Sequence, residues 1–142
     1  MMRPKVVLHN AVSLDGRNNG FPADIGLYYE LIARWQEDAI LVGSGTMLAA
    51  PDEIPPDSES DRQPPEPIPG DSRPLLVVPD SRGQISSWHY WRHQPYWRDI
   101  LVLCSQTTPQ VYLDYLTVGA PLPGWRGAHQ LFLPRPGRAT AK

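Results

Sequence analysis

The sequence feature that most constrains the fold is a short apolar run at residues 39–42 that breaks into Gly43-Ser44-Gly45-Thr46. Four apolar residues without alternation predict a strand buried on both faces, as in a parallel sheet. Two glycines directly after it free the backbone for a tight turn. In open α/β sheets, ligands bind beyond the carboxyl ends of the strands, where the next helix offers unpaired N–H groups. We therefore expect a binding turn here, with a hydroxyl contributed by Thr46.

Three further apolar runs predict strands, so we expect a sheet of at least four strands. These runs are residues 5–13, 75–79 and 100–104. Helical patterns lie between them, and strands that alternate with helices form an α/β protein with a mainly parallel sheet. The turn at residues 80–83 should therefore lie at the same sheet edge as the glycine turn.

The clearest helical pattern places Leu27, Leu31 and Trp35 at four-residue spacing. It begins at Asp24, a residue type that favours the N-cap position. This pattern predicts an amphipathic helix whose apolar stripe packs on the sheet. Shorter helices are predicted at residues 44–50 and 108–116, the second with Val111, Leu113 and Leu116 as its apolar residues.

Arg34 falls seven residues after Leu27, beside the apolar stripe and toward the expected sheet. A cation in that position needs a partner or a ligand, and a phosphate is one candidate. The alternative is a surface ion pair with Glu30 or Asp38, each four residues away.

Two segments have compositions that do not build a packed core. Residues 51–74 hold eight prolines and seven acids against two arginines, which predicts a long surface loop. Residues 119–142 hold four glycines, four prolines and three arginines, which predicts an irregular, basic and poorly ordered tail. We therefore expect one folded domain over residues 1–118.

Charge and cysteine content argue against several classes of function. A net charge of −2 and a pI near 6.0 give no reason to expect nucleic acid or an anionic membrane as a partner. No run reaches the roughly 18 apolar residues of a membrane span, and the N-terminus has no secretory signal. The single cysteine, Cys104, rules out an internal disulfide. We expect a soluble, cytoplasmic protein.

The remaining reactive side chains have weak patterns. His89 and His93 are four residues apart, but no third ligand is evident, so no metal site is expected. The aromatic stretch around them, residues 88–97, has no clear period and predicts a satellite core or a dimer contact. Cys104 ends an apolar run and is predicted to be a buried small hydrophobe. Asp15 precedes Gly16 and suits a plain turn better than a general acid.

Three segments, taken in order, resemble the reductase domain of the bifunctional riboflavin biosynthesis deaminase-reductase proteins. They are Asn10-Ala-Val-Ser-Leu-Asp-Gly16, Asp38-Ala-Ile-Leu-Val-Gly-Ser-Gly-Thr46-Met-Leu-Ala and Leu75-Leu-Val-Val-Pro-Asp-Ser81-Arg82-Gly83. The resemblance implies a dihydrofolate-reductase-like fold and an NADPH-dependent oxidoreductase. Its substrate would be a phosphorylated aminopyrimidine whose ribosylamino group is reduced, and the family also implies a homodimer.

The resemblance assigns roles to six residues of this chain. The implied NADPH contacts are Val12, Gly43, Thr46 and Ser81, and the implied substrate contacts are Arg34 and Asp24. Ser81 beside Arg82 would suit the 2′-phosphate of NADPH. No residue is assigned as proton donor, so the catalytic group is unknown.

The sequence departs from the family at two places. Where the family has an acidic residue near the cofactor, this chain has Ala50, with Asp52 two positions later. The family's next strand, its Gly-Gly phosphate turn and its closing strands are not recognisable after Gly119. These departures predict a C-terminal part that is truncated or replaced. They also support a second hypothesis, a non-catalytic remnant with at most weak nucleotide binding.

Overall fold

The computed structural model describes residues 3–49, 54, 65–66 and 68–118. The chain divides into two compact units, Met1–Glu37 and Asp38–Lys142. The predicted tail at 119–142 and most of the predicted loop at 51–74 lie outside the described residues. The expectation of one domain over residues 1–118 stays a prediction.

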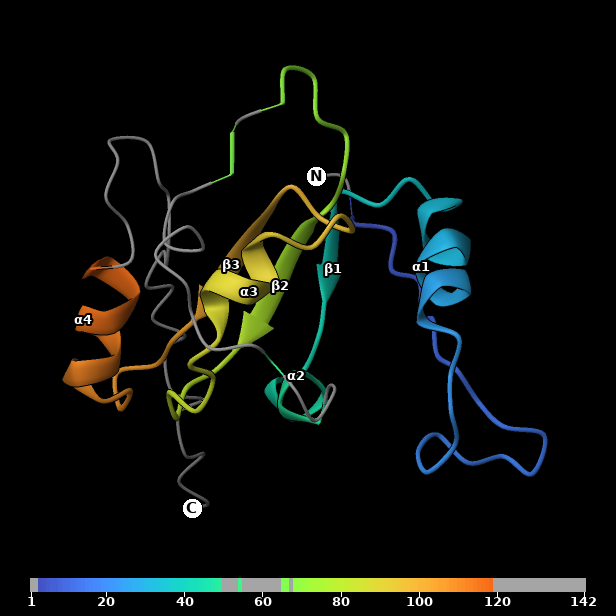
Figure 1. Ribbon diagram of the computed structural model, residues 1–142, viewed down its shortest axis with the longest axis horizontal. Coiled ribbons are helices and arrows are strands. Elements are labelled where there is room, and N and C mark those ends of the chain that lie inside the picture. The colour runs from blue at the N-terminus through green and yellow to red at the C-terminus, as the bar shows by residue number, and fades with distance from the viewer. Residues whose placement is uncertain (1–2, 50–53, 55–64, 67, 119–142) are drawn as a thin grey trace, which may run out of the picture. The chain divides into compact units, whose positions relative to one another are not determined.

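The second unit is built on a small parallel sheet. Strands β1 (Ala39–Leu41), β2 (Leu75–Pro79) and β3 (Asp99–Leu103) pair in the order β1-β2-β3, with β2 in the centre (Figure 1). Leu76 of β2 is in register with Ile40 of β1 and Ile100 of β3. With helices between its strands, the described part has the predicted α/β class. It contains three strands where at least four were expected.

The prediction that the strands are buried on both faces is wrong for this sheet. Along β2 and β3, buried residues alternate with partly exposed ones, so one face carries the packed side chains. Leu76 and Val78 of β2 are fully buried, whereas Leu41 on the edge strand β1 is 72% exposed. An unbroken apolar run in the sequence does not reveal this alternation, because both faces carry the same residue types.

Three helices accompany the sheet, namely α2 (Ser44–Leu48), α3 (Trp88–Arg92) and α4 (Gln110–Val118). The first and last confirm the predicted helices, and α3 supplies the structure that the aromatic stretch left open. Among the α4 side chains that the structure describes, Tyr112 and Leu116 are buried, whereas Val111 of the expected apolar set is 78% exposed. Residues 112 and 116 are one turn apart and share a face.

The aromatic stretch belongs to the main core of this unit. Trp88, Trp91 and Trp97 are all buried. Each indole N–H has an acceptor: Trp97 donates to the carbonyl of Trp91 at 2.8 Å, and Trp91 donates to the hydroxyl of Ser87 at 3.2 Å. The Trp88 indole donates to Tyr112, which is described below. Each hydrogen bond offsets the desolvation of an indole N–H, so these large side chains can be buried without an unpaired donor.

The first unit contains the predicted helix, α1 (Ile25–Ala33), and the predicted cap. The carboxylate of Asp24 accepts a hydrogen bond from the Leu27 amide at 2.9 Å. Leu27 and Trp35 of the apolar stripe are about half exposed, and Ile32 is the buried residue of the helix. Packing of the stripe on the sheet stays a prediction, because the sheet belongs to the other unit. A helical period predicts which side chains share a face, but burial needs an opposing surface.

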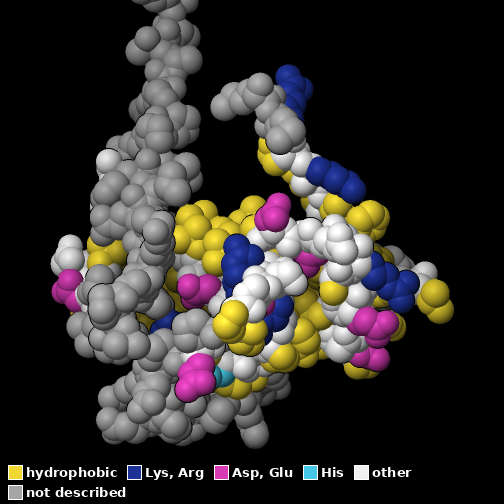
Figure 2. All heavy atoms as spheres, turned by 90° about the horizontal axis from the view of Figure 1, so that it is seen from above, with side chains coloured by type: hydrophobic (Ala, Val, Ile, Leu, Met, Phe, Trp, Pro, Cys, Tyr) yellow, Lys and Arg dark blue, Asp and Glu magenta, His cyan; other side chains and the backbone are white. Residues whose placement is uncertain are grey.

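The predicted strand at residues 5–13 is also wrong. This segment forms no strand in the described part of the chain, and Val6, Leu8 and Val12 are 77%, 96% and 56% exposed. A strand requires backbone partners, and here the segment contacts α1 through side chains instead. Tyr28 donates to the His9 carbonyl at 3.3 Å, and the two rings meet edge to face. Hydrophobic side chains are visible at the molecular surface in Figure 2.

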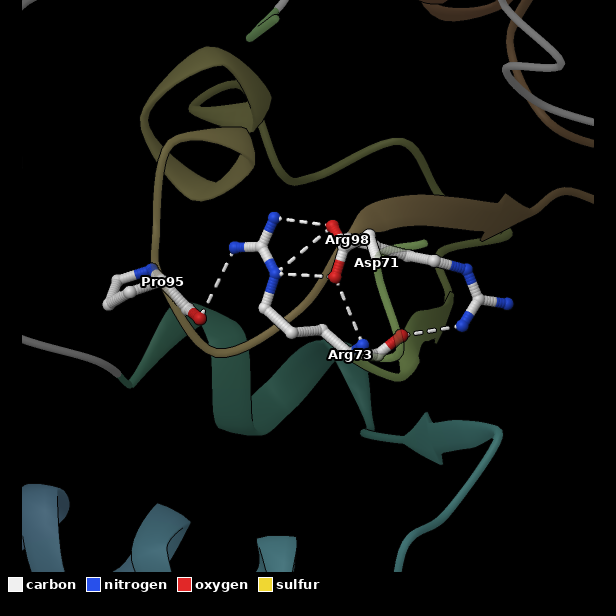
Figure 3. Close-up of polar contacts among 4 residues, drawn as sticks. All are labelled: Asp71, Arg73, Pro95 and Arg98. Carbon is white, nitrogen blue, oxygen red and sulfur yellow. Dashed lines mark hydrogen bonds and ion pairs between the residues drawn. The ribbon is translucent and has the colours of Figure 1, made fainter. Parts of the chain in front are cut away.

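An ion pair stabilises the amino end of the sheet in the second unit. Arg73 donates through two side-chain nitrogens to the carboxylate of Asp71, at 2.9 and 2.7 Å, and its Nη1 donates to the Pro95 carbonyl at 3.3 Å (Figure 3). The Arg98 guanidinium donates to the Arg73 carbonyl. Two-pronged Arg–carboxylate pairs are well oriented. These contacts connect the start of β2 to the residues before β3.

The Asp71 pair predicts a specific acid dependence of stability. The side-chain and backbone hydrogen bonds from Arg73 lower the pKa of Asp71 to about 2 from its ordinary 3.8. A lowered folded-state pKa contributes stability that is present above about pH 4 and is lost as the pH falls toward 2. We expect Asp71→Asn to reduce the thermal midpoint at pH 6 and to flatten its fall between pH 4 and 2. Parallel acid profiles for the two proteins would contradict this.

Candidate functional site

The carboxyl edge of the parallel sheet gathers the ends of all three described strands. Because the strands run in one direction, the segments after β1, β2 and β3 all emerge at this edge (Figure 1). The ends are connected by backbone hydrogen bonds: the Val42 amide donates to Val77 at 3.0 Å, and the Asp80 amide donates to Leu103 at 3.0 Å. The structure thus places the glycine turn and the Asp80 turn on neighbouring strands.

The glycine turn after β1 has an unexpected geometry. Gly43 has a φ of −69°, and Gly45 is absent from the residues with positive φ, so neither needs the conformational freedom of glycine. A Cβ added at either position would meet nothing within 4 Å. The prediction that these glycines are needed for a tight turn is therefore wrong. Because they carry no side chain, the two glycines leave open space beside the backbone.

Thr46 lies in α2 and is exposed. Its amide donates to the Gly43 carbonyl at 3.0 Å. What it offers to a ligand is therefore its side-chain hydroxyl rather than its backbone. The helix has only five residues, so its macrodipole is small.

The turn after β2 confirms the predicted one and is built around Asp80. This side chain is 1% exposed. Its carboxylate accepts hydrogen bonds from the backbone amides of Gln84, at 2.9 Å, and of Ile85, at 3.0 Å. Gly83 has a φ of +64°, which glycine adopts without strain. Ser81 and Arg82, at the tip of the turn, are exposed.

A buried tyrosine of α4 completes this arrangement. The Tyr112 hydroxyl donates to Asp80 at 2.8 Å and accepts from the indole of Trp88 at 2.7 Å. Burial, together with the negative charge of Asp80, raises the pKa of Tyr112, so the hydroxyl keeps its proton. Sequence reasoning missed Tyr112 because the helical pattern was assigned to its neighbours Val111 and Leu113.

The segment after β3 contributes a second group that the sequence did not indicate. The Thr108 hydroxyl donates to the carbonyl of Ser81 at 2.8 Å and accepts from the amide of Ser105 at 2.8 Å. Thr108 itself is buried. It therefore connects the β3 end directly to the residue predicted to contact NADPH. The one sequence signal for Thr108 was that it follows a predicted strand, because the ends of parallel strands lie close together.

Cys104 is buried at the end of β3, as predicted. Burial and the nearby charge of Asp80 raise the pKa of its thiol, against a smaller opposite effect of the Thr108 hydrogen bond. A thiol held in its protonated form is a poor nucleophile.

The other predicted site residues lie in the first unit. Asp24 uses its carboxylate as the helix cap, and Val12 is exposed. Arg34 forms the alternative ion pair with Glu30, at 3.5 Å, and both side chains are largely exposed. Asp15 accepts from Arg17 at 2.9 Å within its turn. The predicted roles of Asp24, Arg34 and Val12 toward substrate and cofactor remain predictions.

No group of three or more His, Cys, Asp or Glu side chains in the described part of the chain is arranged to hold a metal ion. The His93 ring nitrogen Nδ1 instead contacts the His89 carbonyl at 2.8 Å. No helix in the described ranges has the length and apolar character needed to cross a membrane.

Comparisons with known proteins give no match to this chain. No protein family, no curated protein and no solved structure matches it. The function is therefore argued from the residues and their geometry.

Proposed function

We propose that this chain is an NADPH-dependent reductase of the riboflavin deaminase-reductase type, with a dihydrofolate-reductase-like fold. The cofactor would bind along the carboxyl edge of the sheet, against Gly43, Thr46 and Ser81. Support comes from two of the segments that resemble the family, because their turns follow the neighbouring parallel strands β1 and β2. Dinucleotides commonly bind at this edge of parallel sheets.

The observation that carries the proposal is the open space at the two glycines after β1. Gly83 is explained by its positive φ, but Gly43 and Gly45 have neither a positive φ nor a neighbour that a Cβ would meet. Within a helix, glycine costs about 0.5–1 kcal/mol relative to alanine, so Gly45 reduces stability without a structural benefit. Close approach of a ligand to the backbone supplies the missing reason.

The chemistry follows the resemblance. Bound NADPH supplies a hydride, which would add to the C1′ imine or open-chain carbonyl of a phosphorylated aminopyrimidine. The hydroxyls of Thr46 and Ser81 would hold the cofactor by hydrogen bonds, and the exposed guanidinium of Arg82 would pair with its 2′-phosphate. The chain's contribution is then positioning and electrostatics.

A second candidate function is nucleotide binding without turnover. It is favoured because the two predicted substrate residues already bind neighbouring groups in the first unit. Asp24 caps α1, and Arg34 pairs with Glu30, so neither side chain is held ready for a ligand. In this form the turns after β1 and β2 would bind a nucleotide weakly.

Replacing Gly45 by alanine tests whether this glycine is needed for ligand binding or for the fold. We expect Gly45→Ala to raise stability by about 0.5–1 kcal/mol, because alanine favours the helix. We expect the same change to weaken NADPH binding at least about tenfold, or about 1.4 kcal/mol, because the methyl group occupies the open space. NADPH fluorescence titration and thermal unfolding measure the two effects.

Two variants complete this experiment. Gly26→Ala makes the same change inside α1, where a Cβ meets only Asp24 at 3.5 Å, and should leave NADPH affinity unchanged. Thr46→Val removes the hydroxyl and should weaken NADPH binding. Micromolar binding with turnover of an aminopyrimidine ribotide supports the reductase, and binding without turnover supports the second candidate. Absence of detectable NADPH binding by the unaltered chain would overturn both.

A further inference from the structure

Three hydrogen bonds connect the loop after β2, residues 80–87, to α4 and to the segment that precedes α4. At the start of the loop, the Thr108 hydroxyl donates to the Ser81 carbonyl at 2.8 Å. Also at its start, the Tyr112 hydroxyl donates to the carboxylate of Asp80, the residue before Ser81, at 2.8 Å. At its end, the Tyr115 hydroxyl donates to the Ser86 carbonyl. The donors lie three or four residues apart, which places them along one side of the helix start.

The hydrogen bond between Tyr112 and Asp80 is the buried one of the three. Asp80 is 1% and Tyr112 7% exposed, and the same carboxylate that binds the tyrosine also binds the amides of Gln84 and Ile85. The Tyr112 ring also lies directly against Gly83, where a Cβ would come within 2.6 Å of the ring. A buried carboxylate with every donor in place fixes the backbone around it, whereas loss of one donor is costly.

We propose that Tyr112 is a positioning residue for the candidate cofactor site. Through Asp80 it holds residues 80–85 in one conformation, so that Ser81 and Arg82 face a ligand in a single orientation. This inference rests on the proposed NADPH function for its ligand, but the fixing of the loop is a property of the chain alone. Tyr112 itself is buried and acts through Asp80.

The test is Tyr112→Phe, which removes the hydroxyl and keeps the ring against Gly83. We expect amide hydrogen exchange at Gln84 and Ile85 to speed up at least about tenfold under native conditions, because their acceptor loses its third donor. We expect the dissociation constant for NADPH to rise about tenfold and kcat at saturating NADPH to stay within about twofold, since a misoriented loop loses binding rather than chemistry.

Two controls separate positioning from loss of stability. Val102→Ala makes a cavity in the buried side of β3 and lowers stability, but removes none of the side-chain hydrogen bonds that hold the loop. It should leave the exchange at residues 84 and 85 and the NADPH affinity unchanged at temperatures well below unfolding. Tyr28→Phe removes a tyrosine hydroxyl bond in the first unit and should change neither quantity.

Three results of these experiments would contradict the positioning role of Tyr112. Unchanged exchange at residues 84 and 85 in Tyr112→Phe, or faster exchange with unchanged NADPH affinity, would overturn it. An equal effect of Val102→Ala on both readouts would also overturn it. If the unaltered chain binds no NADPH, the proposed function fails, and the exchange data alone then decide whether Tyr112 fixes the loop.

Discussion

Leu76→Ala is expected to lower the free energy of unfolding by about 2–5 kcal/mol, a large part of the stability of a small domain. Leu76 is fully buried on the central strand β2, in register with Ile40 on one side and Ile100 on the other. Truncation leaves a cavity that neighbours on two strands cannot fill without moving the sheet. Urea denaturation followed by tryptophan fluorescence measures the change, because the buried tryptophans belong to this unit.

Leu41→Ala is the matched control. It makes the same truncation in the same sheet, but Leu41 lies on the edge strand and is 72% exposed. We expect a change within about 0.5 kcal/mol. Similar losses for the two variants would mean that the sheet is packed differently from the structure described above.

Gly83→Ala has the second large expected effect. Its φ of +64° strains any residue with a side chain, at a cost of about 1–2 kcal/mol. The new Cβ would also come within 2.6 Å of the Tyr112 ring, and overpacking of this kind adds about 1–3 kcal/mol. We expect both costs to appear as a lower midpoint of denaturation.

Gly70→Ala isolates the first of these costs. Gly70 has a similar φ of +72°, but a Cβ there meets nothing within 4 Å. The difference between the two variants therefore measures the contact of the turn with Tyr112. If Gly70→Ala is as destabilising as Gly83→Ala, the Tyr112 ring adds no steric cost at Gly83. Packing of this ring against the turn would then not contribute to holding the loop in place.

Local chemistry made several elements predictable. The runs at residues 75–79 and 100–104 are strands within one residue of the expected bounds, and Asp24 caps α1. Such features depend on neighbours in sequence: a capping carboxylate reaches an amide three residues away, and a β-branched apolar run favours extended backbone. The turn at residues 80–83 was predictable for the same reason.

Features that need a distant partner were predicted less well. The apolar stripe of Leu27 and Trp35 and the apolar run at residues 5–13 both suggested burial, yet Leu27 and Trp35 are about half exposed and most of the run is more exposed than that. A sequence pattern shows which side chains share a face, but burial depends on what covers that face. In α4 the expected Leu116 is buried, but Tyr112 is buried where Val111 was expected, because valine is the more apolar residue.

The candidate site divides in the same way. The turn after β2 and the position of Gly43, Thr46 and Ser81 just beyond two strands could be predicted from the sequence, because turn residues and apolar runs act over a few neighbouring positions. The binding of Tyr112 and Thr108 to the Asp80 turn is visible in the tertiary structure alone, since these contacts join residues 32 and 27 positions apart. The tertiary structure also showed that Gly83 serves the fold whereas Gly43 and Gly45 leave open space, a distinction that depends on φ and on neighbouring atoms rather than on residue type.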